Sequence, residues 1–248
     1  MSRTLIVGDV HGCLAELDAL LVELEPRAGD RFVFVGDLVD RGPDSVGVVR
    51  RVRELCARYP GSACVAGNHE AKALRGHDRG VPGRPWTVDA SDEDWAFLDA
   101  LPLVWRDPAL GAVVVHGGFY PAFFEVEGPV GDVPADWRRS KTKRAQRLQR
   151  FLYVRQVKAN GNMLSLDQCA PEHDHWTDRY DGREGFAFFG HDPQLEPAEP
   201  LVTPHALGLD TGCCFGGRLT AAVVKGDARR YALVSVPAYG KYAEPLRL

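Results

Sequence analysis

Residues 4–12 read TLIVGDVHG, an apolar run that ends at a glycine followed by an aspartate and a histidine. The same arrangement returns in residues 31–42, RFVFVGDLVDRG, and in residues 63–70, ACVAGNHE. A short apolar run bounded by turn-forming residues is typical of a fully buried β-strand. We therefore predict three strands, each followed directly by side chains that can bind metal or phosphate.

Helical patterns separate these strands. Leucines repeat at helical spacing over residues 13–24, and valines do so over residues 44–59, where Asp44 is suited to cap the first turn. Strands that alternate with helices pair in parallel, and the carboxyl ends of parallel strands share the edge at which α/β proteins bind ligands. Side chains that are far apart in the sequence are therefore expected to converge there.

The remainder of the chain favours β-structure. Strand-like runs are expected at residues 111–115, 185–189, 219–224 and 231–236. The last two are joined as a hairpin through residues 225–227, and Ser91 with Asp94 resembles a capping box before a short helix. Loops are expected at two segments rich in glycine, proline and aspartate: residues 76–90 and 121–136. Because no repeat or linker divides the chain, we predict one α/β domain over residues 1–248 with a large antiparallel component.

Six side chains at strand ends are candidate metal ligands: Asp9, His11, Asp37, Asn68, His116 and His191. Each motif alone is more typical of a turn or a structural histidine, and their recurrence at successive strand ends is what favours metal binding. Carboxylate and amide oxygens mixed with imidazole nitrogens suit borderline divalent ions better than calcium or magnesium alone. Six ligands can serve two ions if one aspartate bridges, and two-metal sites clamp both reacting oxygens of a phosphoryl group. The pattern predicts a dimetal centre for phosphate chemistry.

Together the motifs resemble the signature blocks of the calcineurin-like metallophosphoesterases, in the phosphoprotein phosphatase branch. The blocks are GDVHG at residues 8–12, GDLVDRG at 36–42, GNHE at 67–70 and VHGG at 115–118. Residues 208–221, GLDTGCCFGGRLTA, resemble the end of bacterial symmetrical diadenosine-tetraphosphate hydrolases and of ApaH-like phosphatases. The resemblance implies a central β-sandwich flanked by helices, with the dimetal site at the carboxyl ends of the strands.

The resemblance also implies residue roles. One metal would be held by Asp9 and His11, the other by Asn68, His116 and His191, with Asp37 as the bridging ligand. His69 would be the general acid that protonates the leaving group, oriented by Asp40, and Arg41 would bind phosphoryl oxygens. The implied reaction is in-line attack by a hydroxide that bridges the metals, without a covalent enzyme intermediate.

Some positions leave alternatives open. The family has a second phosphate-binding arginine before its last metal histidine, and Arg155 and Arg183 compete for this role. We favour Arg155 because related ApaH-like sequences carry a similar Leu-Tyr-Val-Arg string. Asp210 lies where related polynucleotide-end phosphatases have an aspartate near the site, although a turn residue is an equally good interpretation. Asp192 stands after His191, where threonine is common in the family, and adds a carboxylate near the site.

A basic segment, residues 137–158, carries nine lysines and arginines and no acidic residue. A solvated helix face is one interpretation, but Leu148, Phe151 and Leu152 recur at near-helical spacing and indicate a packed element. Because the segment lies between two ligand motifs, residues 131–180 are expected to form a basic cap. Such a cap would favour a substrate with several phosphates by electrostatic steering.

Composition argues against several classes of protein, among them general nucleic-acid binders, disulfide-linked proteins and membrane proteins. The 248 residues hold 30 Lys plus Arg against 34 Asp plus Glu, a net charge of −4, which gives no support to general nucleic-acid binding. The six cysteines have irregular spacing and no CxxC pair, so we expect free thiols, including a buried Cys213 and Cys214, and a cytoplasmic location. No apolar stretch approaches the roughly 20 residues of a membrane helix, and no secretory signal is recognised.

These observations predict a phosphohydrolase with two divalent ions, manganese first and iron, nickel, cobalt or zinc as alternatives. The predicted substrate is a nucleotide polyphosphate, diadenosine tetraphosphate, cut symmetrically into two ADP. One alternative is a protein Ser/Thr or Tyr phosphatase, or a broad-specificity phosphatase, which would bind phosphoproteins. Others are dephosphorylation or decapping of RNA ends, and a metal-dependent scaffold without turnover. The scaffold is disfavoured because such proteins tend to lose the proton donor, and His69 is present.

Overall fold

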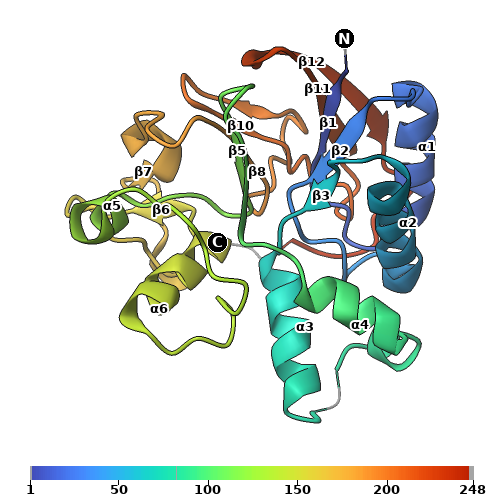
Figure 1. Cartoon of the computed structure of the whole chain (residues 1–248), viewed down its shortest axis with the longest axis horizontal. Coiled ribbons are helices and arrows are strands. Elements are labelled where there is room, and N and C mark those ends of the chain that lie inside the picture. The colour runs from blue at the N-terminus through green and yellow to red at the C-terminus, as the bar shows by residue number, and fades with distance from the viewer. Residues whose placement is uncertain (1, 82, 246–248) are drawn as a thin grey trace.

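Two five-stranded β-sheets form the centre of the molecule in the computed structural model, which describes residues 2–81 and 83–245 (Figure 1). The first sheet has the order β12-β11-β1-β2-β3. Its strands are β1 (Thr4–Val7), β2 (Arg31–Phe34), β3 (Ala63–Cys64), β11 (Arg218–Lys225) and β12 (Asp227–Pro237). The pairs β1–β2 and β2–β3 are parallel, as predicted, whereas β11 pairs antiparallel with both β1 and β12.

The second sheet has the order β4-β5-β8-β10-β9. Its strands are β4 (Val104–Asp107), β5 (Ala112–Val115), β8 (Phe186–Phe189), β9 (Leu201–Val202) and β10 (Ala206–Gly208). The three central strands are parallel to one another, and both edge strands are antiparallel to their neighbours. A separate two-stranded sheet joins β6 (Gln156–Val157) to β7 (Asp174–His175).

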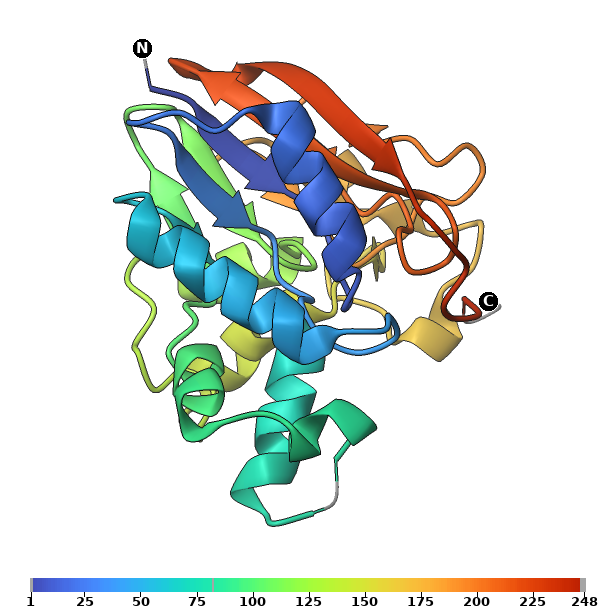
Figure 2. The same ribbon diagram turned by 90° about the vertical axis from the view of Figure 1, so that its right-hand side faces the viewer.

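Six α-helices of the described residues surround the sheets. They are α1 (Leu14–Leu24), α2 (Ser45–Arg58), α3 (Asn68–Asp78), α4 (Asp92–Asp99), α5 (Pro121–Glu127) and α6 (Lys143–Gln149). Short 3-10 turns occupy Pro85–Val88, Arg150–Leu152, Leu166–Gln168 and Trp176–Arg179. Figure 2 shows α1 and α2 lying across the outer face of the first sheet, and Figure 1 places α5 and α6 beyond the second sheet. None of the described helices is both long enough and apolar enough to cross a membrane.

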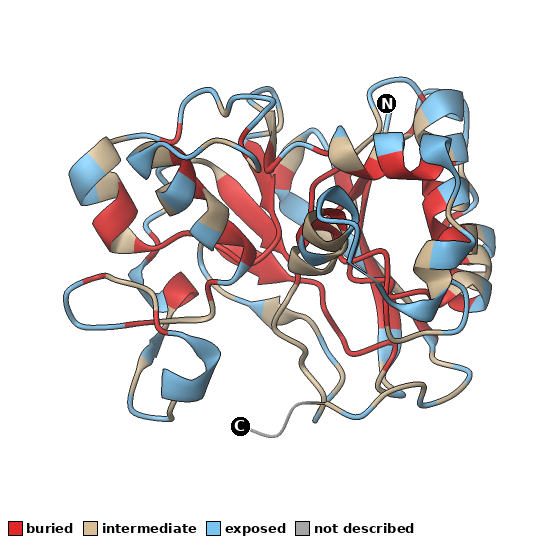
Figure 3. Ribbon diagram, turned by 90° about the horizontal axis from the view of Figure 1, so that it is seen from below, coloured by how far each residue is buried: buried red, intermediate tan, exposed pale blue. Residues whose placement is uncertain are grey.

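The space between the sheets is filled by one face of each strand. Ile6 and Val33 of the first sheet pack there with Val114 and Phe188 of the second. The neighbouring positions point outward, and Leu5, for example, packs under α1 and α2. Because both faces of the central strands are covered, β1, β5 and β8 are buried at every position, and Figure 3 shows buried positions concentrated in the strands. The predicted β-sandwich flanked by helices is confirmed.

Local signals in the sequence explain several element boundaries. The Asp44 side chain accepts a hydrogen bond from the Gly47 amide at the start of α2. Ser91 and Asp94 cap α4 reciprocally, as predicted. The hairpin between β11 and β12 turns at Gly226, whose φ of 73° suits glycine.

The prediction of a loop over residues 121–136 is wrong for α5. Pro121 occupies the first turn of this helix, where its missing N–H is not needed and its fixed φ is helical. Phe123 is buried against the cluster that covers the second sheet. In the segment 76–90, α3 continues to Asp78 and a 3-10 turn begins at Pro85, while Pro82 lies outside the described residues.

Candidate dimetal site

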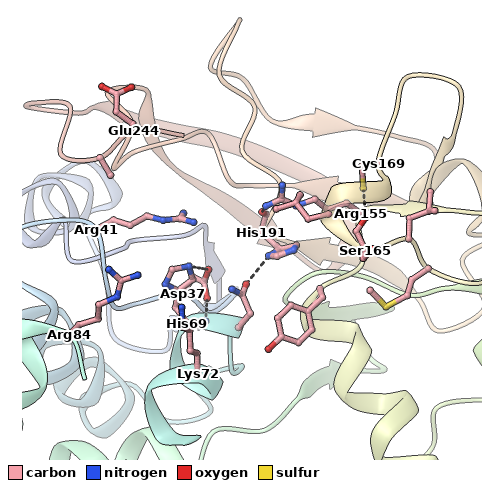
Figure 4. A pocket seen from close by; sticks show the side chains of 16 residues that line it. Asp37, Arg41, His69, Lys72, Arg84, Arg155, Ser165, Cys169, His191 and Glu244 are labelled. Carbon is pink, nitrogen blue, oxygen red and sulfur yellow. Dashed lines mark hydrogen bonds and ion pairs between the residues drawn. The ribbon is translucent and has the colours of Figure 1, made fainter. Parts of the chain in front are cut away.

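The candidate ligands lie where the strands of both sheets end, and His11, Asn68, His116 and His191 gather around Asp37 (Figure 4 shows Asp37 and His191). Asp9 joins them through Oδ2, which accepts a hydrogen bond from the His191 amide at 3.0 Å. The Oδ2 atom of Asp37 lies 3.5 Å from His11 Nε2, and its Oδ1 atom lies 3.4 Å from His116 Nε2. Asn68 Oδ1 lies 3.0 Å from His116 Nε2 and 2.8 Å from His191 Nδ1. Side chains from five separate segments thus meet within bonding reach of a small ion.

Asp37 belongs to both of the compact ligand groups at this edge. The ligand atoms of Asp37, His11 and His69 lie within 4.8 Å of one another, and so do those of Asp37, His116 and His191. Sharing of one carboxylate by two groups is the arrangement that a bridging ligand requires. His69 enters the first group with its Nε2 atom 4.0 Å from Asp37 Oδ2.

Backbone carbonyls fix the orientation of two candidate histidine ligands. His11 Nδ1 donates to the Val39 carbonyl at 2.9 Å, and His116 Nδ1 donates to the Val35 carbonyl at 2.8 Å. Each ring therefore presents Nε2 to the site, which is the usual arrangement of a metal-binding histidine. Burial lowers the pKa of His11 to about 3, so this ring is neutral and has a lone pair to offer. For His116, burial is outweighed by the charge of Asp37, which raises the pKa to about 10 in the absence of a cation.

Two buried carboxylates beside the candidate ligands have oxygens that lack hydrogen-bond partners among the described residues. These atoms are Asp9 Oδ1 and Asp210 Oδ2. Burial raises the pKa of Asp210 to about 6, and burial together with the charge of Asp210 raises that of Asp9 well above its ordinary value. Buried carboxylates are normally paired or coordinate a metal, so this crowding of negative charge fits divalent cations.

Backbone strain concentrates at the same residues. Among the described residues, six that are not glycine have a positive φ, and five of them are candidate site residues: His11, Asp37, Asp40, Arg41 and His191. A left-handed conformation at such residues costs about 1–3 kcal/mol each and persists only when the surroundings enforce it. The strain is a structural sign of function at these positions.

Two glycines allow the carboxylates to approach the backbone closely. A Cβ atom on Gly190 would lie 1.8 Å from Asp9 Oδ1, and one on Gly67 would lie 2.1 Å from Asp37 Oδ1. Any larger residue would occupy the space beside the candidate ligand oxygens. The Gly190-His191 and Gly67-Asn68 steps therefore require glycine for a steric reason.

Glu70 holds the loop that carries Asp37, a role that the sequence did not reveal. One oxygen accepts from the amides of Asp37 and Gly67 at 2.9 and 2.8 Å, and the other accepts from the amide of Leu38 at 2.8 Å. The side chain is fully buried, and burial raises its pKa to about 7. The glutamate of the GNHE motif was the available signal, since a glutamate three residues into a helix reaches back to its N-terminus.

His69 is oriented by Asp40. His69 Nδ1 lies 2.7 Å from Asp40 Oδ2, and the other oxygen of Asp40 accepts from the Trp86 indole N–H at 2.7 Å. Burial lowers the pKa of His69, but the charges of Asp37 and Asp40 outweigh it and the pKa lies above its ordinary value. The ring can therefore carry a proton on Nε2. No pattern in the sequence pointed to Trp86.

The two competing arginines have different surroundings. Arg155 lines the site cavity, donates from Nη2 to the His191 carbonyl at 2.7 Å, and lies 3.5 Å from Asp192 Oδ1. Arg183 pairs with Asp181, is half exposed, and lines a different depression. Asp192, the residue that departs from the family pattern, thus contacts the arginine that reaches the site.

A cavity of about 720 Å³ opens over these residues. Arg41 lines it, with Nη1 2.7 Å from His11 Nε2, and so do Lys72 and Arg84, which sequence reasoning missed. The opposite end is apolar, and Tyr153 and Leu166 contribute to it. Figure 4 shows Arg41 and Arg84 on one side of Asp37 and Arg155, Ser165 and Cys169 on the other, with Lys72 next to His69.

Four of the nine cations of the basic segment 137–158 form ion pairs away from the site cavity. Arg138 and Arg139 pair with Asp78 and Asp99, and Arg144 and Arg147 pair with Glu127. Acidic residues remote in sequence pair with these four arginines, and none of the four lines the site cavity. Leu148, Phe151 and Leu152 are buried, so the segment is a packed element as predicted.

The cysteines follow expectation. All six are free, and both Cys213 and Cys214 are buried. Cys213 groups with Cys13 and Glu16 in the interior, away from the two groups that share Asp37.

Comparison with known proteins places the chain in a family. The family model described as calcineurin-like phosphoesterase matches residues 2–207. A protein of Chromohalobacter salexigens named symmetrical bis(5'-nucleosyl)-tetraphosphatase is 33% identical, over 90% of this chain and 96% of that protein. A protein of Yersinia pestis with the same name is 32% identical, over 92% of this chain and 90% of that protein.

Solved structures agree in fold. A crystal structure provisionally described as a diadenosine tetraphosphatase superposes with a TM-score of 0.72 at 31% identity, covering 96% of this chain and 94% of that one. A cold-active protein-tyrosine phosphatase of a Shewanella species gives a TM-score of 0.63 at 15% identity, covering 95% and 80% of the chains, which shows a shared fold alone. By the matched family model and by relatives of this identity and coverage, the chain belongs to the calcineurin-like phosphoesterase family and is a metal-dependent phosphohydrolase.

Proposed function

We propose that this phosphohydrolase cuts diadenosine tetraphosphate symmetrically into two ADP. The observation that carries the proposal is the sharing of Asp37 by two compact ligand groups beneath a cavity that is cationic at one end. The names of the relatives that match over nearly their whole length support the choice of substrate. The neighbours named as protein phosphatases are near 15% identical and lend phosphoproteins no comparable support.

We propose the following ligands for two divalent ions, manganese being our first choice. Asp9 and His11 would hold one ion, Asn68, His116 and His191 would hold the other, and Asp37 would be common to both. Support comes from the unpartnered Asp9 oxygen and from imidazoles anchored through their other nitrogen. Divalent ions bound there would neutralise phosphoryl oxygens and make water a stronger nucleophile at neutral pH. The mixed oxygen and nitrogen set suits manganese, iron, cobalt, nickel or zinc.

The protein's own groups would handle the leaving oxygen and the phosphoryl charge. When water attacks phosphorus and the bond to the bridging oxygen breaks, the departing ADP needs a proton. His69 is suited to donate it from Nε2, because Asp40 holds Nδ1 and favours the protonated ring. Arg41 and Arg155 would bind the non-bridging oxygens, for which a guanidinium provides paired donors.

We further propose a cytoplasmic location, on the support of six free thiols. Persistence of reduced cysteines is usual where glutathione and thioredoxin maintain a reducing environment.

Identification of the products tests the proposed substrate. The purified protein is incubated with manganese and diadenosine tetraphosphate, and nucleotides are separated by chromatography. We expect ADP as the sole nucleotide product and far slower release of phosphate from phosphoserine and phosphotyrosine peptides. Formation of ATP plus AMP would contradict symmetrical cleavage, and faster turnover of the peptides would favour the protein phosphatase alternative.

A further inference from the structure

The site cavity is chemically divided. One end presents Arg41, Lys72 and Arg84, three cations beside His69. The other end has the apolar side chains of Tyr153, Met163, Leu164 and Leu166, together with Ser165, Cys169 and a single cation, Arg155. Phosphate groups make no favourable contact with apolar side chains. A ligand that fills the cavity must therefore combine a polyanion with a flat or bulky apolar part.

The apolar end exposes side chains that a folded protein normally covers. Leu166 retains 37% of its accessible surface and Tyr153 retains 36%. Leu164, which lines the same end, is buried. Apolar surface left open next to a strongly charged centre indicates that a ligand covers it.

Tyr153 is held rigidly at this end. Its hydroxyl accepts a hydrogen bond from Arg75 Nη2 at 3.0 Å, and its ring lies edge-on to the His191 ring at 6.4 Å between centroids. The ring therefore lies beside a candidate metal ligand, and neither Arg75 nor His191 stacks on its face. Aromatic rings that are fixed in this way serve as platforms for planar groups.

We propose that the end lined by Tyr153, Met163 and Leu166 binds the nucleobase of the nucleotide half whose phosphorus is attacked. This inference rests on the proposed function, because the polyphosphate must lie across the Asp37 groups. His69, Lys72 and Arg84 share the opposite end, so the leaving half departs in that direction. Ser165, which lines the base end, offers a hydroxyl to the polar edge of the base.

Equilibrium binding of ADP and of pyrophosphate to the manganese-loaded protein tests the base site. Both probes carry a diphosphate, and ADP alone carries a nucleoside. In the wild-type protein ADP should bind about tenfold more tightly than pyrophosphate, because stacking and apolar contact of one base are worth about that much. In the double variant Tyr153→Ala, Leu166→Ser the advantage of ADP should disappear while pyrophosphate binds as before.

Leu233→Ser is the matched control. Leu233 lies on β12 and is 42% exposed, close to the exposure of Leu166, but does not line the cavity. This variant should keep the wild-type preference for ADP. Equal binding of ADP and pyrophosphate by the wild type, or an undiminished preference in the double variant, would overturn the proposal. Equal weakening of ADP and pyrophosphate binding in the double variant would also overturn it. So would a double variant that binds a phosphoserine peptide more weakly than wild type while its binding of ADP is unchanged.

The same experiment separates this inference from the proposed reaction. If the wild type prefers ADP and the double variant does not, but the wild type fails to cleave diadenosine tetraphosphate, the base site is supported and the proposed reaction is wrong. If cleavage is symmetrical but the double variant retains its preference, the reaction stands and the base site is wrong.

Discussion

Asp37 illustrates how a single residue is placed for function. Its φ of 50° is a strained conformation for an aspartate, and Glu70 holds it by accepting the amides of Asp37 and its successor. The charge of Asp37 is then available to the imidazoles around it. Burial raises its pKa, but the charges of His116 and His69 outweigh this and hold the pKa well below its ordinary value. The carboxylate is thus kept ionised although its side chain is almost completely buried.

Arg155 and Arg183 supply a residue-scale prediction with an internal control. Arg155→Ala should lower kcat/KM for diadenosine tetraphosphate about a hundredfold, because it removes a charge-assisted contact to a phosphoryl group. Arg183→Ala should change it less than about twofold, since this side chain pairs with Asp181 outside the cavity. Steady-state kinetics decide the matter, and a larger effect of Arg183→Ala would reverse the assignment.

At the residue scale, sequence reasoning could identify side chains whose position follows from the backbone. Asp9, Asp37 and Asn68 stand directly after strands, so parallel pairing alone brings them to one edge. It could not identify Trp86, because this indole reaches Asp40 from a 3-10 turn whose position depends on tertiary packing. The choice between Arg155 and Arg183 likewise required side-chain positions.

At the scale of elements, α4 is connected to the site through aromatic stacking. Trp95 of α4 stacks on Trp86 at 5.5 Å, and Trp86 donates to Asp40, which orients His69. The N-terminus of α4 is in turn fixed to α2, because Arg50 and Arg53 pair with Asp94. The orientation of His69 therefore depends on the docking of two helices that contribute no candidate ligand.

Asp94 gives an element-scale prediction of pH-dependent stability. Burial raises its pKa, but hydrogen bonds from Ser91 and Arg50 outweigh this, so the pKa lies below its ordinary value of 3.8. A lowered carboxyl pKa stabilises the fold above the ordinary value, and this stabilisation is lost as pH falls through the folded-state value. Asp94→Asn should therefore reduce the free energy of unfolding by about 1–3 kcal/mol at pH 7, and the difference from wild type should shrink below about pH 4.

Asp92→Asn is the control for this prediction. Asp92 lies in the same helical turn and loses the same charge, but its side chain is exposed. Its effect should stay below about 0.5 kcal/mol. Urea denaturation at several pH values measures both variants, and equal losses would show that charge at the helix terminus, rather than the buried network of Asp94, is responsible.

Element boundaries were predictable where a local signal was strong. A few neighbouring residues determine each of three boundaries: the cap of α2, the cap of α4 and the turn at Gly226. The structure has all three as predicted. The helix α5 was missed because the glycine-rich stretch that follows it dominated the composition of the window. The third strand, β3, is only two residues long because the chain turns at Gly67 to present Asn68.

At the scale of the whole molecule, metal binding should stabilise the fold. Three buried aspartates, Asp9, Asp37 and Asp210, repel one another without a cation. A ligand at about a hundred times its dissociation constant stabilises a protein by about 2.7 kcal/mol, and about 2–4 °C in Tm accompanies each kcal/mol at this size. Manganese should therefore raise Tm by several degrees above the value in a chelator.

Two variants connect this stabilisation to residue roles. Asp37→Asn should lose most of the manganese-induced rise in Tm, whereas His69→Asn should keep it and lose turnover. The result for His69→Asn is the more informative of the two, because His69 lies within one of the two ligand groups. Equal loss of the Tm shift in both variants would make His69 a metal ligand rather than the proton donor.

The architecture of the molecule was largely predictable, since strands alternating with helices and a C-terminal hairpin fix most of the two sheets. What the sequence did not reveal is the neutralisation of the basic segment. These ion pairs form only after folding, because Arg138 lies 60 residues from Asp78 and Arg139 lies 40 residues from Asp99 in the chain. Charge runs can be read from sequence, but their partners are set by tertiary structure.

The position of β1 between β2 and β11 has a consequence for how the enzyme is made. Ribosomes make the chain from its N-terminal to its C-terminal end, so Asp9 and His11, which follow β1, emerge before residues 218–225, the final neighbour of that strand. Until then one edge of β1 has no partner, and open strand edges are the surfaces that misassociate. The nascent chain thus holds every proposed ligand before it holds a finished sheet. We expect metal binding and activity only after residues 218–225 have been made, and a product that terminates before β11 should be inactive.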